Sequence, residues 1–221
     1  MKFLIITKKK WKLDNFKDLN KNFTVSTTLN ISKIKKLNPK IIFFIHWSKI
    51  VSKSIYEKYL CIQFHSSNLP KGRGGSPIQN QILLNKEKTN ITAFKIVKNL
   101  DAGPICLKDD LSLKGNASEI FERMENKSIK MIKKIIKIKK LKFNEQKGKP
   151  SYFKRRSKLD SEINFKKVKS IRKLYDFLRM LDAPGYPKAY IKLKKFKIFF
   201  NDIKMVKKKI NANVAIKINE K

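Results

Sequence analysis

Residues 61–80 read CIQFHSSNLPKGRGGSPIQN, and this stretch decides which fold the chain is expected to have. An apolar run ends at His65, and a polar loop rich in glycine follows it. Ser76 suits the N-cap of a helix, Pro77 suits its first position, and Gln79 completes a capping box. A strand, a loop and a helix in this order place His65 at the carboxyl end of a parallel strand, where open α/β sheets bind their ligands.

Short apolar runs alternate with segments of helical periodicity on both sides of this stretch. The runs expected to form strands are Phe3–Thr7, Phe23–Thr27, Ile41–His46, Cys61–His65 and Ile91–Val97. The segments expected to form helices are 11–22, 31–38, 52–59, 77–85 and a long amphipathic one over 117–138. Strands that alternate with helices predict an α/β fold with a mostly parallel sheet covered by helices.

The character of the chain changes after about residue 144. The stretch 144–160 is polar and contains Gly148 and Pro150, which is typical of a linker. A further helix is expected over Ser170–Leu181, and strands over Ala189–Phe200 and Val214–Ile218. The expected organisation is a first domain over 1–145, a linker over 146–169, and a small β-containing accessory unit over 170–221.

Lysine dominates the composition. The chain holds 54 Lys and Arg residues against 17 Asp and Glu, which gives a formal net charge of +37. Such a charge attracts polyanions at low salt through counterion release and favours a nucleic-acid partner. The lysines are nevertheless spread from Lys2 to Lys221 and accompany many Ile and Asn residues, as in a protein from an AT-rich coding sequence. Compositional drift is therefore the preferred explanation, and a polyanionic partner is the alternative.

Two further features bear on the compartment. The apolar part of the segment Met1–Thr7 is only four residues long and precedes a lysine cluster, so it is too short for a signal peptide or a membrane span. Cys61 and Cys106 show neither CxxC spacing nor a disulfide-rich context, and they are expected to be buried free thiols. We expect a cytoplasmic protein with no membrane partner.

Asp101 lies in a second informative segment, residues 99–105, which read NLDAGPI. The segment follows an expected strand, so Asp101 belongs to a tight turn at a strand end. Taken alone, a histidine at a strand end is more often structural, and an aspartate before Ala-Gly usually serves a turn. Together, His65 and Asp101 could meet across a cleft. Trp47 follows another strand end, and it either lines this cleft or packs in the core.

The two segments together resemble the folate-dependent formyltransferase family, which includes methionyl-tRNA, glycinamide ribonucleotide and sugar N-formyltransferases. The resemblance rests on the order His, three residues, Leu-Pro, two residues, Arg-Gly, two residues, Pro-Ile-Gln, and later Leu-Asp-Ala-Gly-Pro-Ile. It covers roughly residues 39–125 and resumes at 152–156 and 177–190. It implies a Rossmann-like catalytic domain in the first part of the chain, with N10-formyltetrahydrofolate as the formyl donor.

The resemblance also implies a catalytic set of asparagine, histidine and aspartate. His65 and Asp101 match two members, whereas Gln63 stands where the family has asparagine. Gln63 keeps the carboxamide but adds a methylene, so either it still reaches the formyl oxygen or its polar role is lost. His65, helped by Gln63 or a backbone N–H, would stabilise the oxyanion that forms when an amine attacks the formyl carbon. Asp101 would orient His65 and take up the proton that the amine sheds.

The glycine-rich loop is expected to border both substrates. The residues expected to bind the donor or the acceptor are Ser66, Arg73, Gly74, Gly75, Trp47 and Gly103. Arg73 is either an anion clamp or a cap for a carbonyl group. The reaction requires no metal, and no cluster of His and Cys in the sequence suits one.

Two acceptor amines are considered. The first is the amino group of a nucleotide-linked amino sugar, and the second is the methionine amino group of initiator tRNA. The segment after the linker is short for the C-terminal domain of the tRNA enzymes, whereas the charge favours tRNA. Because drift explains the charge, we expect the sugar. Two other hypotheses are a non-catalytic relative that binds folate or a nucleotide, and a basic nucleic-acid-binding protein. The sequence leaves a homodimer open.

Overall fold

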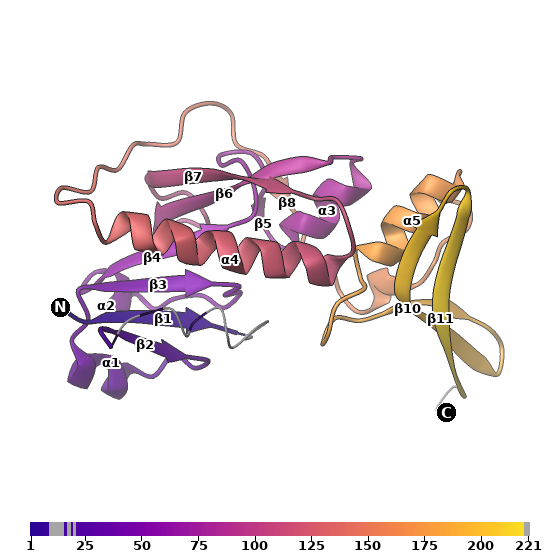
Figure 1. Ribbon diagram of the computed structural model, residues 1–221, viewed down its shortest axis with the longest axis horizontal. Coiled ribbons are helices and arrows are strands. Elements are labelled where there is room, and N and C mark those ends of the chain that lie inside the picture. The colour runs from indigo at the N-terminus through magenta and orange to yellow at the C-terminus, as the bar shows by residue number, and fades with distance from the viewer. Residues whose placement is uncertain (9–15, 17–18, 20, 219–221) are drawn as a thin grey trace. The chain divides into compact units, whose positions relative to one another are not determined.

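A computed structural model describes residues 1–8, 16, 19 and 21–218, which belong to two compact units (Figure 1). The N-terminal unit comprises Met1–Pro77, Thr89–Leu111 and Phe121–Phe153, and the C-terminal unit comprises Ile78–Lys88, Ser112–Ile120 and Lys154–Lys221. The helix expected over 11–22 lies largely outside the described residues. The domain boundaries expected at residues 145 and 170 stay a prediction.

The main sheet has the strand order β2-β1-β3-β4-β6-β7. Its strands are β1 (Phe3–Thr7), β2 (Phe23–Ser26), β3 (Ile41–Ile45), β4 (Leu60–His65), β6 (Lys88–Lys95) and β7 (Ile105–Ser112). β1 pairs in parallel with β2 and β3, and β3 pairs in parallel with β4, whereas β6 is antiparallel to β4. The predicted α/β fold with a mostly parallel sheet is confirmed, and the antiparallel pairing makes the sheet mixed.

One strand of this sheet was not expected. β7 carries charged residues at Lys108, Asp109 and Asp110 between its apolar ones, so its sequence lacks a clear strand pattern. Its place at the edge of the sheet explains the charges, because an edge strand keeps contact with water.

Both faces of the central strands are buried. On one face the Phe3 ring lies 5.0 Å from Phe23 and 6.4 Å from Phe43, and Phe43 lies 6.3 Å from Phe64. This row of rings crosses β2, β1, β3 and β4. The other face belongs to a second apolar cluster, whose members include Leu4, Ile6, Ile42, Phe44, Trp47, Ile55, Tyr59, Cys61 and Ile96. Burial on both faces explains why these strands read as continuous apolar runs.

Helices α1 (Ile31–Leu37), α2 (Lys53–Tyr56), α3 (Pro77–Leu83) and α4 (Ala117–Ile135) connect or cover the strands (Figure 1). α4 begins with a reciprocal cap, because Asn116 Oδ1 accepts from the Glu119 N–H at 3.0 Å and Glu119 Oε2 accepts from the Asn116 N–H at 2.9 Å. Among residues 1–8, 16, 19 and 21–218, no helix combines the length and the apolar character needed to cross a membrane.

The C-terminal unit contains the short helix η2 (Leu159–Ser161), α5 (Ile171–Arg179) and an antiparallel sheet with the order β11-β10-β9. The expected strand Ala189–Phe200 is corrected to two strands, β9 (Ala189–Lys192) and β10 (Phe196–Val206). The chain reverses between them, where the Leu193 N–H donates to the Phe196 carbonyl at 2.9 Å. The last strand, β11 (Lys209–Ile218), begins earlier than expected because it pairs along β10.

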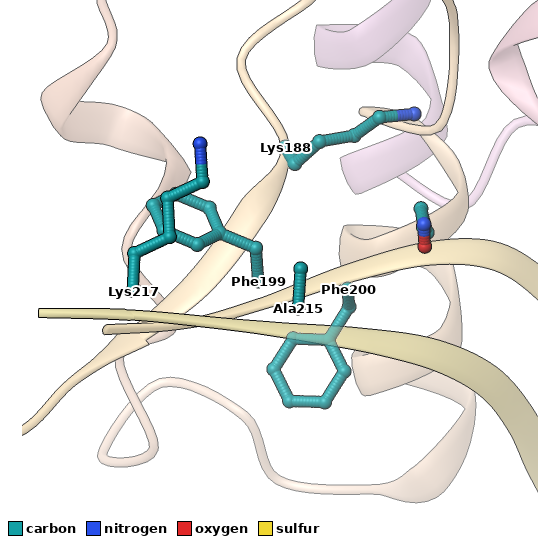
Figure 2. Close-up of a pocket in the computed structure, with 6 residues that line it drawn as sticks. Lys188, Phe199, Phe200, Ala215 and Lys217 are labelled. Atoms are coloured by element: carbon teal, nitrogen blue, oxygen red, sulfur yellow. The ribbon is translucent and has the colours of Figure 1, made fainter. Parts of the chain in front are cut away.

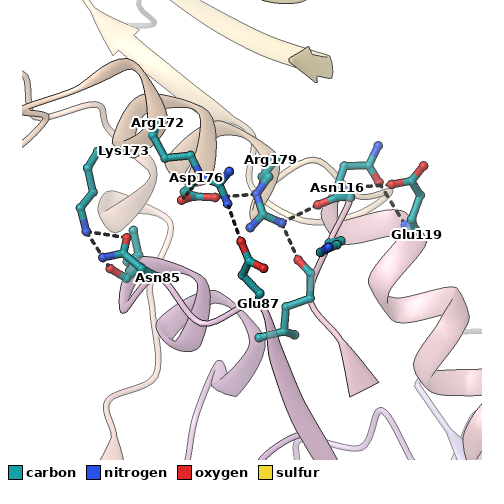
Figure 3. Close-up of polar contacts among 12 residues, drawn as sticks. Asn85, Glu87, Asn116, Glu119, Arg172, Lys173, Asp176 and Arg179 are labelled. Carbon is teal, nitrogen blue, oxygen red and sulfur yellow. Dashed lines mark hydrogen bonds and ion pairs between the residues drawn. The ribbon is translucent and has the colours of Figure 1, made fainter. Parts of the chain in front are cut away.

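A buried arginine anchors α5 within the C-terminal unit (Figure 3). Arg179 is 3% exposed, and its Nε donates to Asp176 Oδ1 at 2.7 Å. Its Nη1 donates to the carbonyl oxygens of Leu113 at 2.7 Å and Gly115 at 2.5 Å. Asp176 is 1% exposed and also accepts from Arg172 Nε at 3.1 Å. The pair therefore satisfies backbone carbonyls that a purely apolar contact would leave without donors.

Candidate active site

His65 is the last residue of β4 and is 6% exposed. Its Nε2 lies 2.8 Å from the carbonyl oxygen of Gly72. A carbonyl oxygen only accepts, so Nε2 carries the hydrogen in this bond. The other ring nitrogen, Nδ1, faces Asp101 Oδ2 at 3.7 Å. The imidazole therefore presents one nitrogen as a donor and turns the other toward a buried carboxylate.

Asp101 reaches His65 by an unexpected route. Because β6 is antiparallel to β4, with Ile62 opposite Lys95 and His65 opposite Thr92, β6 ends next to the beginning of β4 rather than beside His65. The loop after β6 therefore turns back, and Asp101 adopts the left-handed conformation with φ 49°. Its Oδ2 accepts from the Gly74 N–H at 2.8 Å, which fixes the carboxylate next to His65.

The glycine-rich loop is supported by a segment that follows much later in the chain. β5 (Arg73–Gly74) pairs in parallel with β8 (Tyr152–Phe153). The Gly72 N–H donates to Ser151 Oγ at 2.9 Å, and the Gly75 N–H donates to the Phe153 carbonyl at 3.0 Å. This support holds the Gly72 carbonyl and the Gly74 N–H where they meet His65 and Asp101.

Two residues that support the site loops were not predicted from the sequence. Gln146 lies in the expected linker, and its Nε2 donates to the carbonyl oxygens of Asp101 and Gly103, each at 2.8 Å. Lys108 on β7 donates from Nζ to Asn68 Oδ1 at 2.6 Å and to the Leu69 carbonyl at 2.8 Å. Partial burial lowers the pKa of Lys108. Neither residue lies in a motif, and only their contacts reveal them.

The other predicted site residues fall into two groups. Gly74, Gly103 and Arg73 belong to the network around Asp101, and Ser66 and Gly75 are buried in the same loop. Gly103 has to be glycine, because a Cβ there would lie 1.7 Å from the Lys95 carbonyl oxygen.

Gln63 and Trp47 are less closely tied to this network. Gln63 precedes His65 by two positions on β4, so the two side chains share one face of the strand. Within the described residues, the Gln63 carboxamide has no hydrogen-bond partner. Trp47 packs in the core, with its ring 6.1 Å from that of Phe44.

Gly74→Ala is expected to disrupt the site. Gly74 has φ 97°, and a Cβ there would lie 2.5 Å from the Phe153 carbonyl oxygen, so the β5–β8 pair would have to separate. The N–H that holds Asp101 would move with it. We expect at least about 10²-fold loss of turnover, the size expected for a misplacement near 1 Å. The measurement is turnover together with the melting temperature.

Gly148→Ala is the matched control for this substitution. Gly148 has φ 96°, yet a Cβ there would meet nothing within 4 Å. The two variants therefore share the cost of a positive φ, about 1 kcal/mol, and differ in the clash. Equal activity of the two variants would show that the Gly74 N–H does not position Asp101.

A pocket of about 310 Å³ lies in the C-terminal unit (Figure 2). Its lining consists of Lys188, Phe199, Phe200, Asn201, Ala215 and Lys217, and includes none of the predicted site residues. Phe199 and Phe200 are neighbours on β10, and their rings point to opposite faces of the sheet (Figure 2). Within the described residues, no group of three His, Cys, Asp or Glu side chains could hold a metal ion.

The fold and the site define a family. The family model described as formyl transferase matches residues 7–137, and the model described as methionyl-tRNA formyltransferase, C-terminal domain, matches residues 158–217. The chain belongs to the formyl transferase family, which confirms the predicted resemblance.

Two of the similar proteins are methionyl-tRNA formyltransferases. The methionyl-tRNA formyltransferase of Sulfurihydrogenibium sp. is 30% identical over 201 residues, which cover 86% of this chain and 63% of the relative. The chain thus spans less than two thirds of that curated relative. The solved methionyl-tRNA formyltransferase from Clostridium thermocellum is 38% identical with a TM-score of 0.92, and the match covers 99% of this chain and 100% of that chain.

A more distant solved structure shares the fold alone. HypX from Aquifex aeolicus, in complex with tetrahydrofolic acid, is 12% identical with a TM-score of 0.75, and the match covers 92% of this chain and 38% of that chain.

Proposed function

We propose that this protein moves the formyl group of N10-formyltetrahydrofolate onto the methionine amino group of initiator tRNA. The observation that carries the choice of acceptor is the match of residues 158–217 to the C-terminal domain of methionyl-tRNA formyltransferases. The sequence had favoured an amino sugar because this segment looked too short for that domain. The match removes that objection, and tRNA becomes the preferred acceptor.

The donor follows from the family. A reduced folate carries the formyl group on N10, and the bond from N10 to the formyl carbon is the one that breaks. Support for a folate in this fold comes from HypX, whose structure holds tetrahydrofolic acid. The acceptor nitrogen forms a new bond to the formyl carbon and loses a proton, while N10 gains one. The products are the formylated amine and tetrahydrofolate.

His65 would stabilise the oxyanion. When the amine attacks, negative charge develops on the formyl oxygen, and a preorganised donor lowers the barrier most effectively at that atom. The His65 Nε2–H, which donates to the Gly72 carbonyl at 2.8 Å, would turn to this oxygen. Asp101 Oδ2, 3.7 Å from Nδ1, would keep the ring oriented for this contact. The same carboxylate would receive the proton that the amine sheds, directly or through water.

Gln63 would supply a second donor to the same oxygen. It shares one face of β4 with His65, and within the described residues its carboxamide has no hydrogen-bond partner. We therefore expect Gln63→Asn to keep or raise kcat, because asparagine restores the side chain that the family uses. A folded Gln63→Asn variant without turnover would assign the extra methylene a role of its own. The measurement is kcat with saturating donor and acceptor.

The charge supports a polyanionic acceptor. The net charge of +37 includes Lys188 and Lys217, which line the C-terminal pocket together with Phe199. Lys197 on the same strand lies over the Tyr190 ring at 5.6 Å. Lysines that lie next to aromatic rings suit phosphates and bases. The positive charge, for which compositional drift was the preferred explanation, would then contribute to tRNA binding.

The test is release of tetrahydrofolate from N10-formyltetrahydrofolate with methionyl-tRNA and, separately, with a panel of nucleotide-linked amino sugars. Turnover with methionyl-tRNA that falls steeply as salt rises would support the proposal, because phosphate contacts release counterions. Turnover with a sugar alone would show that the acceptor is an amino sugar, as the sequence analysis expected. Folate binding without turnover on any acceptor would identify a non-catalytic relative.

A further inference from the structure

Gln146 uses every hydrogen-bonding position of its carboxamide. Oε1 accepts from Arg73 Nε at 3.1 Å and from Arg73 Nη2 at 2.7 Å. Nε2 donates its two hydrogens to the carbonyl oxygens of Asp101 and Gly103. The backbone is fixed two residues earlier, where Asn144 and Ile105 exchange N–H···O bonds of 2.7 and 2.9 Å. A side chain with this many partners on an anchored backbone has one orientation.

The Asp101 turn needs such support. A non-glycine residue with φ 49° is held in a sparsely populated backbone region, so contacts must retain it there. The Gly74 N–H holds the Asp101 carboxylate, and Gln146 holds the Asp101 main chain. Without Gln146, two carbonyl oxygens lose their donor. The turn can then relax, and the carboxylate moves away from His65.

We infer that Gln146 is the positioning residue that holds Asp101 beside His65, and that Arg73 acts through Gln146. The inference rests on the proposed function and deepens it. Arg73 determines which way the carboxamide faces, because its cation attracts Oε1 and leaves Nε2 to the two carbonyl oxygens. The reverse orientation would set the amide oxygen against two carbonyl oxygens and the NH2 group against the guanidinium. Arg73 is then a part of the site's support rather than a clamp on the substrate.

The decisive variant is Gln146→Glu. Glutamate keeps the length of the side chain and strengthens the pair with Arg73, yet it offers no N–H to the carbonyl oxygens of Asp101 and Gly103. If the side chain at position 146 only held Arg73, glutamate would serve as well as glutamine or better. If this side chain positions Asp101, glutamate fails, because it has no N–H to donate. We expect Gln146→Glu and Gln146→Ala to lower kcat by roughly 10- to 100-fold while KM for the folate stays within about twofold.

Glu145→Ala is the matched control. Glu145 is exposed on the same segment, and its removal should leave kcat and the melting temperature unchanged. Wild-type kcat in Gln146→Glu would overturn the inference. Arg73→Ala should lower kcat by a similar factor, and the double variant with Gln146→Ala should be no worse than either single one. A large rise in KM for Arg73→Ala would instead support the interpretation of Arg73 as an anion clamp on the substrate.

A spectroscopic measurement separates this inference from the proposed function. The chain has only two histidines, His46 and His65, so ¹⁵N-histidine labelling yields two imidazole spin systems. In Gln146→Glu we expect the His65 ring signals to shift, because Asp101 withdraws from Nδ1, and the His46 signals to stay. This result stands whichever acceptor is used, even if the wild type shows no turnover. Unchanged His65 signals would overturn the inference regardless of activity.

Discussion

His65→Ala is expected to lower kcat/KM for formyl transfer by at least about 10³-fold, because it removes the oxyanion donor and the partner of Asp101 together. The side chain is 6% exposed, and its two ring nitrogens face Gly72 and Asp101. Alanine leaves a small cavity near the surface of the sheet, so the fold should persist. The measurement is kcat/KM for formyl transfer from initial rates below saturation, alongside circular dichroism and folate affinity.

Asp101→Ala should have an effect of similar size, since His65 then loses the charge beside Nδ1 and the amine loses its proton acceptor. Asp101→Asn separates the two contributions of the carboxylate. The asparagine oxygen can still accept from the Gly74 N–H, which donates to Asp101 Oδ2 at 2.8 Å, so the turn should keep its place. A loss as large as that of alanine would show that the charge matters rather than the position. Turnover like that of the wild type in either alanine variant would remove the proposed mechanism.

Asp176→Ala is expected to lower the free energy of unfolding by about 3–5 kcal/mol, because it leaves the buried Arg179 guanidinium without its counter-ion. Asp176 is 1% exposed and Arg179 is 3% exposed, so water cannot replace the lost carboxylate. For a chain of this length, each kcal/mol shifts the melting temperature by roughly 2–4 °C, and the expected fall is therefore about 6–20 °C. The measurement is urea unfolding followed by circular dichroism, with calorimetry as a check.

Arg172→Met is the control for this pair. Arg172 also donates to Asp176, but its side chain is 58% exposed, and exposed ion pairs contribute little, about 1 kcal/mol at most. Replacement of Asp176 and Arg179 together by leucine and methionine should recover part of the loss, because no charge is then buried alone. The carbonyl oxygens of Leu113 and Gly115 would still lack their donor. A stability near that of the wild type in Asp176→Ala would show that Arg179 finds another partner.

The amino-acid sequence by itself determined the fold class and predicted the centre of the candidate site. Continuous apolar runs such as β1 and β3 belong to strands buried on both faces, and Ser76-Pro77 marked the beginning of α3. These are local signals, because periodicity, caps and turns depend on neighbouring residues. The motif around His65 and the motif around Asp101 also pointed to the same family, and the structure brings the two side chains together.

Only the tertiary structure decided how that meeting occurs and what supports it. The direction of β6 depends on which edge of β4 it joins, and no pattern within Lys88–Lys95 encodes that choice. Gln146 lies in a polar stretch that reads as a linker, 45 residues after Asp101, and its role arises from contacts across that distance. Periodicity carries no information about such contacts, because a hydrogen bond between distant segments depends on the path of the whole chain. The motifs therefore predicted His65 and Asp101, and only the fold shows that Gln146 contacts the turn that carries Asp101.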